Sequence, residues 1–164
     1  LIVYVHDSRV PDALADRAAL VARSCYALEA RKTANLVARI YNAALADQGL
    51  EVAQFSTLCA IAMGRAESIT VLARALGVDR STLVRNLERL VRQGFVAGVP
   101  EGRRVRHVLT ARGAAALERA FGRWQVAQDR LASAAGTASA EDPRAAMARL
   151  RRAVRSLDPA WKGA

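Results

Sequence analysis

The sequence predicts a mainly α-helical protein that contains one small β-hairpin, and three observations support this fold class. Apolar residues recur at helical spacing over most of the 164 residues. Two short helical segments within residues 68–93 are separated by a glycine, as in a helix-turn-helix. The period changes from 3.6 to two only over residues 95–109, which indicates a pair of strands.

The N-terminal part of the chain is expected to be helical after a short irregular segment. Residues 1–10 have no helical pattern and are expected to form a loose arm. Pro11 and Asp12 then open one long helical stretch, which Gly49 ends. The stripe of this stretch repeats at spacings of three and four residues: Thr33, Leu36, Val37, Ile40, Tyr41, Ala44 and Leu45.

A second helix is expected from about Val52 to Met63, with Gly64 as its stop. Its apolar face is expected to contain Phe55, Leu58, Cys59 and Ala62. This helix would begin a compact domain that spans residues 51–110.

The helix-turn-helix is indicated by residues suited to helix ends. Ser68 can cap the first of its two helices, and Gly77 tolerates the positive φ that a tight turn requires. Ala73 places a small side chain where the two helices approach one another. Asp79 can cap the second helix, and Gly94 ends it. The chain from 68 to 93 therefore predicts two helices with a sharp turn between them.

The second of these helices has two different faces. The inner face is expected to contain Leu83, Leu87, Leu90 and Val91. The outer face is expected to contain Thr82, Arg85, Asn86 and Arg89. Hydroxyl, amide and guanidinium groups are the donors and acceptors that contact base edges and phosphates in a major groove. The outer face is therefore a candidate surface for reading duplex DNA.

Residues 95–109 predict a β-hairpin with a basic tip. We expect strands at Phe95–Val99 and Arg103–Leu109, with residues 100–102 as the turn. Val105, His107 and Leu109 would face one side of the second strand, so that this side can pack. Arg104 and Arg106 would face the other side and meet phosphates. A hairpin directly after a candidate recognition helix predicts a winged helix-turn-helix.

Two further helices are expected at the C-terminal end. Thr110 can cap a long helix whose stripe contains Leu117, Ala120, Phe121, Trp124, Gln128 and Leu131. The small residues 132–140 predict a linker. Asp142 and Pro143 open a last helix, whose expected inward residues are Met147, Leu150, Val154 and Leu157. Residues 11–50 and 111–164 are too long and apolar for one small winged domain, so they predict a dimerisation region built from both termini.

Composition narrows the class of partner. The formal net charge is +10, and residues 65–112 hold ten arginines and four acidic residues. A basic region of this kind suits a polyanion such as double-stranded DNA. No apolar run approaches the length of about 20 residues that spans a membrane, so we expect a soluble, cytoplasmic protein without membrane contact. No metal site, cofactor site or catalytic constellation is indicated, so an enzyme is not expected.

A family resemblance rests on short groups of residues spread along the chain. In order, these are Tyr41-Asn-x-x-Leu45, Gly49-Leu50, Gln54-Phe55-Ser-x-Leu58, Leu72-Ala73, Asp79-Arg-Ser-Thr-Leu83, Asn86-Leu87, Gly94-Phe95-Val96 and Leu109-Thr110-x-x-Gly113. Their order and spacing resemble the MarR family of bacterial transcription regulators over most of residues 20–131. The resemblance implies a homodimeric repressor that binds a pseudo-palindromic operator and is released by a small aromatic or phenolic ligand.

The resemblance also implies which residues contact DNA. The positions that fall at the recognition helix are Arg80, Ser81, Thr82, Arg85 and Asn86. Arg103 and Arg104 fall at the tip of the wing. The family commonly has an aspartate just before this arginine pair, whereas this chain has Gly102. Two alternatives follow: the tip of the wing is less ordered in the free protein, or Glu101 takes over the role of the aspartate.

The signal that would release DNA is left open between two alternatives. For a small-molecule pocket, the candidate lining residues are Tyr26, Arg31, Tyr41, Phe55 and Met63. For oxidant sensing, the candidate is Cys25, although the sensing position of the peroxide-responsive branch aligns with Ala27. A different function is also left open: the chain is a winged-helix module that binds protein, and its basic face is incidental.

Overall fold

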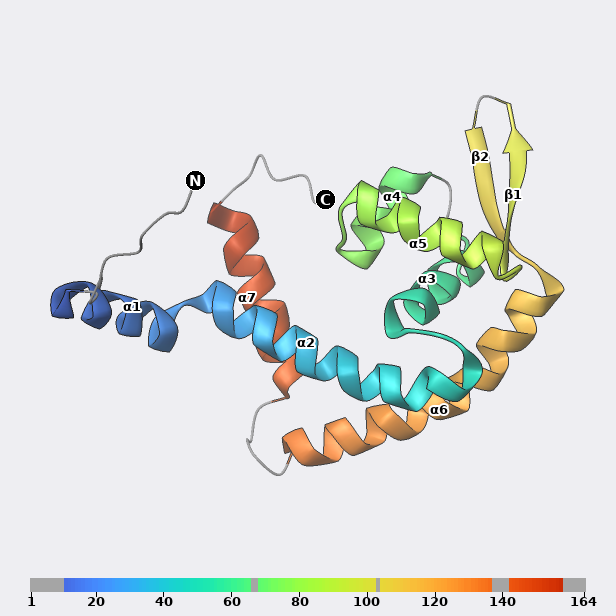
Figure 1. The fold of residues 1–164 in the computed structure, drawn as a ribbon. Coiled ribbons are helices and arrows are strands. Elements are labelled where there is room, and N and C mark those ends of the chain that lie inside the picture. Colours follow the sequence, from blue (N-terminus) through green and yellow to red (C-terminus); the bar gives the residue numbers. More distant parts are fainter. Residues whose placement is uncertain (1–10, 66–67, 103, 137–141, 158–164) are drawn as a thin grey trace, which may run out of the picture. The chain divides into compact units, whose positions relative to one another are not determined.

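The computed structural model describes residues 11–65, 68–102, 104–136 and 142–157 (Figure 1). In order, the elements are α1 (Asp12–Ser24), α2 (Tyr26–Leu45), the 3-10 helix η1 (Ala46–Gln48), α3 (Val52–Ala62), α4 (Ile69–Leu76), α5 (Arg80–Arg92), β1 (Val96–Glu101), β2 (Arg104–Leu109), α6 (Ala111–Gly136) and α7 (Pro143–Leu157). Helices dominate, and β1 and β2 form an antiparallel hairpin, which confirms the predicted fold class. The expected N-terminal arm at 1–10 lies outside the described residues.

The chain divides into two compact units, Leu1–Arg39 and Ile40–Ala164, and each is described by itself. In the first unit, the prediction of one continuous helix from Asp12 is wrong. The backbone of Cys25 is extended, with φ −77° and ψ 110°, and separates α1 from α2. The Ser24 hydroxyl donates to the Leu20 carbonyl at 2.8 Å, a local bond that competes with the helical ladder.

The core of the second unit is formed by the end of α2, by α3 to α6 and by the start of β1. Its most deeply buried apolar side chains are Leu45, Leu58, Leu72, Leu83 and Leu90. Burying one such side chain contributes about 1.5–3 kcal/mol to folding. Because leucines from α3, α4 and α5 share one core, the three helices hold one another in place.

The helix-turn-helix forms as its capping residues predict. The Ser68 hydroxyl accepts from the Val71 amide at 3.1 Å at the start of α4. Gly77 has φ +67° in the turn, and Asp79 caps α5 by accepting from the Thr82 amide at 2.8 Å. Gly94, with φ +73°, follows the end of α5. These residues confirm the predicted ends of both helices.

Two expected core residues are exposed instead. Val91 is 45% exposed, because it lies about 80° around the helix from the Leu83, Leu87 and Leu90 stripe. Ala62, in the last turn of α3, is also exposed, whereas Ile61 beside it is buried. Cys59 is partly buried and packs against the core. The buried face of α5 is therefore narrower than predicted, whereas α3 buries more sides than predicted, including Gln54, Thr57 and Ile61.

The first strand of the hairpin ends two residues later than predicted, and both strands begin one residue later. Strand β1 continues through Pro100 to Glu101, and the register pairs Val96 with Leu109 and Glu101 with Arg104. Gly102 takes a positive φ of 62° next to the tip. The turn is therefore tighter than the expected segment 100–102. In Figure 1 the hairpin projects away from α3 and leads directly into α6.

The C-terminal helices begin as predicted, but the linker between them starts later. The Thr110 hydroxyl accepts from the Gly113 amide at 3.0 Å, and Asp142 accepts from the Arg144 amide at 2.9 Å. Helix α6 continues to Gly136, because the alanines assigned to the linker are strong helix formers. The remaining linker residues 137–141 lie outside the described part of the chain.

Helix α7 does not bury its apolar stripe within a single chain. The expected inward residues are all exposed: Met147, Leu150, Val154 and Leu157. Across the described ranges, the helices lack the length and apolar content that crossing a membrane would require.

Candidate nucleic-acid interface

The first two turns of α5 present polar side chains to solvent. The exposed members are Arg80, Ser81, Thr82 and Arg85. Leu83 and Leu87 anchor the opposite side of the helix in the core. A basic helix fixed by its apolar side can enter a major groove without losing its own support.

Asp79 organises the start of this surface. Its carboxylate accepts from the Ser81 hydroxyl at 2.6 Å and from the Thr82 hydroxyl at 2.8 Å, in addition to the Thr82 amide. The hydrogen bonds from Ser81 and Thr82 hold the pKa of Asp79 well below its usual range. The cap therefore stays ionised at neutral pH, and both hydroxyls are held close to the helix end.

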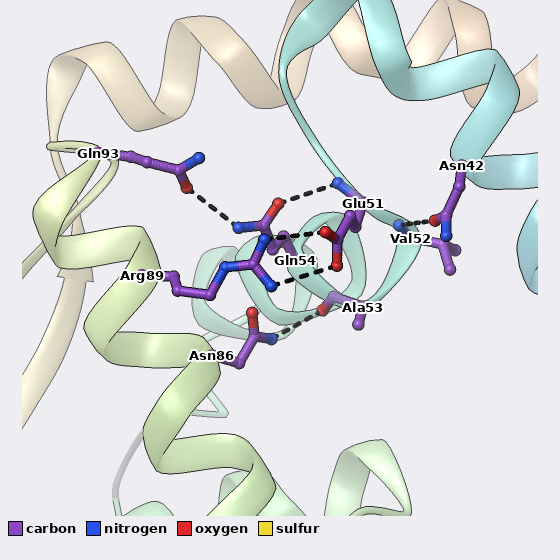
Figure 2. Close-up of polar contacts among 8 residues, drawn as sticks. All are labelled: Asn42, Glu51, Val52, Ala53, Gln54, Asn86, Arg89 and Gln93. Atoms are coloured by element: carbon purple, nitrogen blue, oxygen red, sulfur yellow. Dashed lines mark hydrogen bonds and ion pairs between the residues drawn. The ribbon is translucent and has the colours of Figure 1, made fainter.

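Asn86 does not point away from the protein, so its expected orientation is wrong. Its amide nitrogen donates to the Thr57 hydroxyl at 2.8 Å. It also donates to the Ala53 carbonyl at 3.2 Å, the contact that Figure 2 shows. Thr57 is completely buried in α3. The reason is that α3 packs against this side of α5. The sequence pattern divided the helix into an inner and an outer face only, and did not include a side that contacts α3.

Arg89 is also drawn toward α3. Its guanidinium forms an ion pair with Glu51, with Nη2 and Oε1 2.8 Å apart and Nη1 and Oε2 3.4 Å apart (Figure 2). Both side chains are about half exposed. Arg89 was expected on the outer, DNA-facing side, but in this structure its charge is directed to a carboxylate of the same chain.

A buried amide extends the contact between α3 and α5. Gln54 is only 1% exposed, and its side-chain nitrogen donates to the Gln93 side chain at 3.1 Å. The Gln54 side-chain oxygen accepts from the Glu51 amide at 2.9 Å, which completes a capping box at the start of α3. Sequence reasoning missed the roles of Glu51, Gln54 and Gln93. The spacing Glu-x-x-Gln before an apolar run was the available signal.

The same end of α3 is tied to α2. The Asn42 side-chain oxygen accepts from the Val52 amide at 2.7 Å, and Asn42 lies in the part of α2 that belongs to the second unit. Figure 2 shows these contacts running from Asn42 through the start of α3 to Arg89 on α5 and to Gln93, which follows α5. The recognition helix is thus positioned by polar contacts as well as by its leucines.

The hairpin carries its own basic side chains. Arg104 and Arg106 are exposed on β2, whereas Arg103 lies outside the described residues. Glu101 pairs with Arg106 at 3.6 Å. Glu101 therefore has an arginine partner in the wing, and that partner is Arg106, which lies outside the arginine pair at 103 and 104.

A groove of about 470 Å³ lies beside the recognition helix. Its lining includes Val52 and Ala53 from α3, Val78 from the turn, and Arg85 and Arg89 from α5. The rest of the lining combines these apolar side chains with polar ones that include Glu51, Ser56 and Asn86. The groove therefore brings cationic and apolar groups together directly beside the exposed face of α5.

The five candidate ligand-pocket residues occupy different surroundings. Phe55 belongs to the core and stacks on Trp124, with ring centroids 6.0 Å apart. The Tyr41 hydroxyl donates to the Gln128 side chain on α6, and burial raises the pKa of Tyr41. Met63 is exposed near the end of α3. Tyr26 and Arg31 are exposed on the part of α2 within the first unit.

The two cysteines are free thiols in different settings. Cys25 lies at the break between α1 and α2 and is partly exposed. Cys59 packs against the core, and burial raises the pKa of its thiol. A partly buried thiol with a raised pKa is poorly suited to react as a thiolate.

Comparison with known proteins gives one family. Residues 48–105 match the model of the MarR family. No curated protein sequence is similar enough to this chain to count as a match.

Solved structures are similar over most of the chain. The Mycobacterium tuberculosis transcriptional regulator MosR has 33% identity and a TM-score of 0.71, and the match covers 81% of this chain and 97% of MosR. MosR in complex with DNA has 32% identity and a TM-score of 0.71, with 82% and 99% covered. Mutant Escherichia coli MarR with operator DNA has 26% identity and a TM-score of 0.65, with 77% and 91% covered. With its helix-turn-helix, its wing and these similarities, the chain belongs to the MarR family of transcription regulators.

Proposed function

We propose that this chain is a repressor that binds a pseudo-palindromic operator as a homodimer. The observation that carries the proposal is the basic, exposed start of α5 beside a hairpin that exposes Arg104 and Arg106. Helix α5 would enter a major groove, where Arg85 can contact base edges. The hairpin would reach the backbone and the neighbouring minor groove, where arginine is favoured.

Two relatives support the DNA partner. MosR and E. coli MarR have both been crystallised with DNA, and in the E. coli protein that DNA is an operator. The similarity to MosR covers nearly all of that protein. The assignment of individual DNA contacts in this chain rests on the geometry of α5 and β2.

Exposed apolar side chains support the homodimer. They occur on helices outside the helix-turn-helix, and include Leu14, Leu20 and Val21 of α1, Leu36 and Ile40 of α2, Phe121 and Val126 of α6, and Leu150, Val154 and Leu157 of α7. A single chain in water seldom exposes so many large apolar residues on its helices. A second copy would cover them and would present two recognition helices to two half-sites.

Release by a small aromatic ligand completes the proposal. Two of the candidate lining residues contact α6: Tyr41 through Gln128, and Phe55 through Trp124. A ligand that changed these contacts would alter how α6 supports α3, and α3 in turn holds α5. Titration with salicylate during DNA binding tests this part, and an unchanged DNA affinity would exclude this class of inducer at the concentrations used.

Duplex binding at several salt concentrations tests the main proposal. Fluorescence anisotropy with DNA from upstream of the gene should show a log affinity that falls linearly with log salt, by about 0.9 for each phosphate contacted. A scrambled duplex should bind more weakly. Binding that is independent of salt would instead favour a protein-interaction module.

Light scattering tests the homodimer. It should give twice the chain mass of 17.6 kDa, and a monomer would contradict the dimer.

A further inference from the structure

Glu51 is an acidic side chain placed beside the basic recognition helix. It comes from the residue that precedes α3, and its carboxylate oxygens lie 2.8 and 3.4 Å from the Arg89 guanidinium. The two residues are 38 positions apart, so the pair is a tertiary contact between α3 and α5. Figure 2 shows the Arg89 side chain extending from α5 toward Glu51.

Arg89 would otherwise be available to DNA. It lies four residues after Arg85, which places it about 6 Å further along the same side of α5. Both arginines border the same groove, and Arg89 is 49% exposed. A long guanidinium side chain in this position can extend to a phosphate next to the groove that α5 occupies.

Neighbouring contacts keep Glu51 in reach of Arg89. The Glu51 amide donates to the Gln54 side chain, and Gln54 is nearly fully buried. Asn86, one turn before Arg89, is held by the buried Thr57. Both ends of the ion pair are therefore attached to fixed backbone, which keeps the two side chains within reach of one another although each is about half exposed.

We propose that Glu51 competes with DNA phosphate for Arg89 and thereby lowers the affinity of the recognition helix for every duplex. While the pair is formed, Arg89 contributes no phosphate contact, and the Glu51 carboxylate adds a negative charge beside the polyanion. Sequence discrimination is left to the outer residues of α5, Arg85 among them. This inference rests on the proposed function.

The consequence is a limit on non-specific binding. Phosphate contacts supply most of the affinity for unrelated DNA, whereas base contacts supply discrimination. An arginine held by a carboxylate therefore weakens binding to unrelated sequences without removing a base contact. Glu51 is a positioning residue in this scheme, since it acts through Arg89.

Salt titrations of four variants on a mixed-sequence duplex test the proposal. Glu51→Gln removes the charge and keeps the length of the side chain. It should bind about eightfold more tightly at about 0.1 M salt and steepen the slope of log affinity against log salt by about 0.9, the effect of one extra phosphate contact. Glu88→Gln removes an equal charge from the part of α5 that borders another cavity, with His107 and Val91, and should leave the slope unchanged.

The double variant Glu51→Gln with Arg89→Ala tests whether the tighter binding of Glu51→Gln depends on Arg89 or comes only from the loss of a negative charge. The steeper slope should disappear when Arg89 is absent. A gain that is equally large without Arg89, an unchanged slope in Glu51→Gln, or weaker binding by Glu51→Gln would each overturn the proposal. If Glu51→Gln does not fold, Arg89→Ala alone decides: it should keep the wild-type slope, and a shallower slope overturns the proposal.

Failure of this inference and failure of the proposed function have different signatures. A wild-type chain that binds no duplex overturns both. A wild-type chain that binds its operator with the expected salt dependence, while Glu51→Gln leaves affinity and slope unchanged, overturns only the competition between Glu51 and DNA.

Discussion

Gly113 lies so close to Phe95 that an added Cβ at Gly113 would be 1.9 Å from the Phe95 carbonyl oxygen. The same carbonyl accepts from the Thr110 amide at 3.1 Å, and the Thr110 hydroxyl donates to the Gly94 carbonyl at 2.7 Å. The start of α6 is therefore attached directly to the end of α5 and the base of the hairpin. Any change in the direction of α6 acts on the elements that would contact DNA.

Gly113→Ala should destabilise the winged domain. A contact of 1.9 Å with backbone cannot be relieved by a side-chain rotation, so the start of α6 must move away from Phe95. Overpacking of this kind costs about 1–3 kcal/mol. Urea denaturation followed by circular dichroism measures the loss, and an unchanged midpoint would show that this junction is looser than the structure indicates.

Gly122→Ala is the matched control in the same helix. An added Cβ at Gly122 meets nothing within 4 Å. Replacing a helical glycine with alanine then stabilises by up to about 1 kcal/mol. Opposite signs for the two substitutions would attribute the loss at Gly113 to its contact with Phe95 and exclude a general effect of alanine in α6.

Asn86 and Thr57 should be energetically coupled. Thr57→Val keeps the shape of the side chain, and Asn86→Ala removes the donor that bonds to it. Each single change should lower the free energy of unfolding by about 1 kcal/mol, with a coupling energy of about 0.5–1.5 kcal/mol in the double variant. Denaturant unfolding of all four proteins measures this cycle. Strict additivity would contradict a role for this bond in fixing α5.

The elements predicted correctly from the sequence depend on local chemistry. Gly77, Asp79 and Gly94 act within a few residues of their own positions, so their effect on helix ends is visible in the chain itself. The break at Cys25 is marked by neither glycine nor proline, and helical periodicity continues through it. A break of this kind has no strong local signal.

In the candidate site, the orientation of a side chain was predicted correctly only where that side chain makes no contact with another helix. Arg85 is exposed as expected: it borders the same groove as residues of α3, but no group of α3 is hydrogen-bonded to it. Asn86 and Arg89 were assigned to the same outer face, yet α3 supplies Thr57 and Glu51 as partners. The approach of α3 is decided by packing between residues 29 or more positions apart, which a single-helix pattern does not contain.

Arg85→Ala and Arg104→Ala should weaken DNA binding in different ways. If Arg85 makes a bidentate base contact, its loss costs about 1–3 kcal/mol on the operator and relaxes sequence preference. Arg104 on β2 should instead contact backbone, so its loss weakens all duplexes similarly. Competition between operator and scrambled DNA measures both effects. Unchanged operator affinity in Arg85→Ala at physiological salt would show that another residue of α5 reads the bases.

His107 should make the folded state less stable as the pH falls. Burial lowers the pKa of His107 below its ordinary value, so the unfolded chain takes up this proton at a higher pH than the folded chain does. Where the unfolded state binds more protons, the free energy of unfolding falls with decreasing pH, here from about pH 6.5 downward. His107→Gln should remove this part of the decline. Denaturant unfolding at several pH values between about 7 and about 5 compares the two chains within the range where most carboxylates remain ionised. Parallel profiles for wild type and variant, or a wild-type protein that gains stability on acidification, would contradict the burial of a neutral imidazole at the base of the wing.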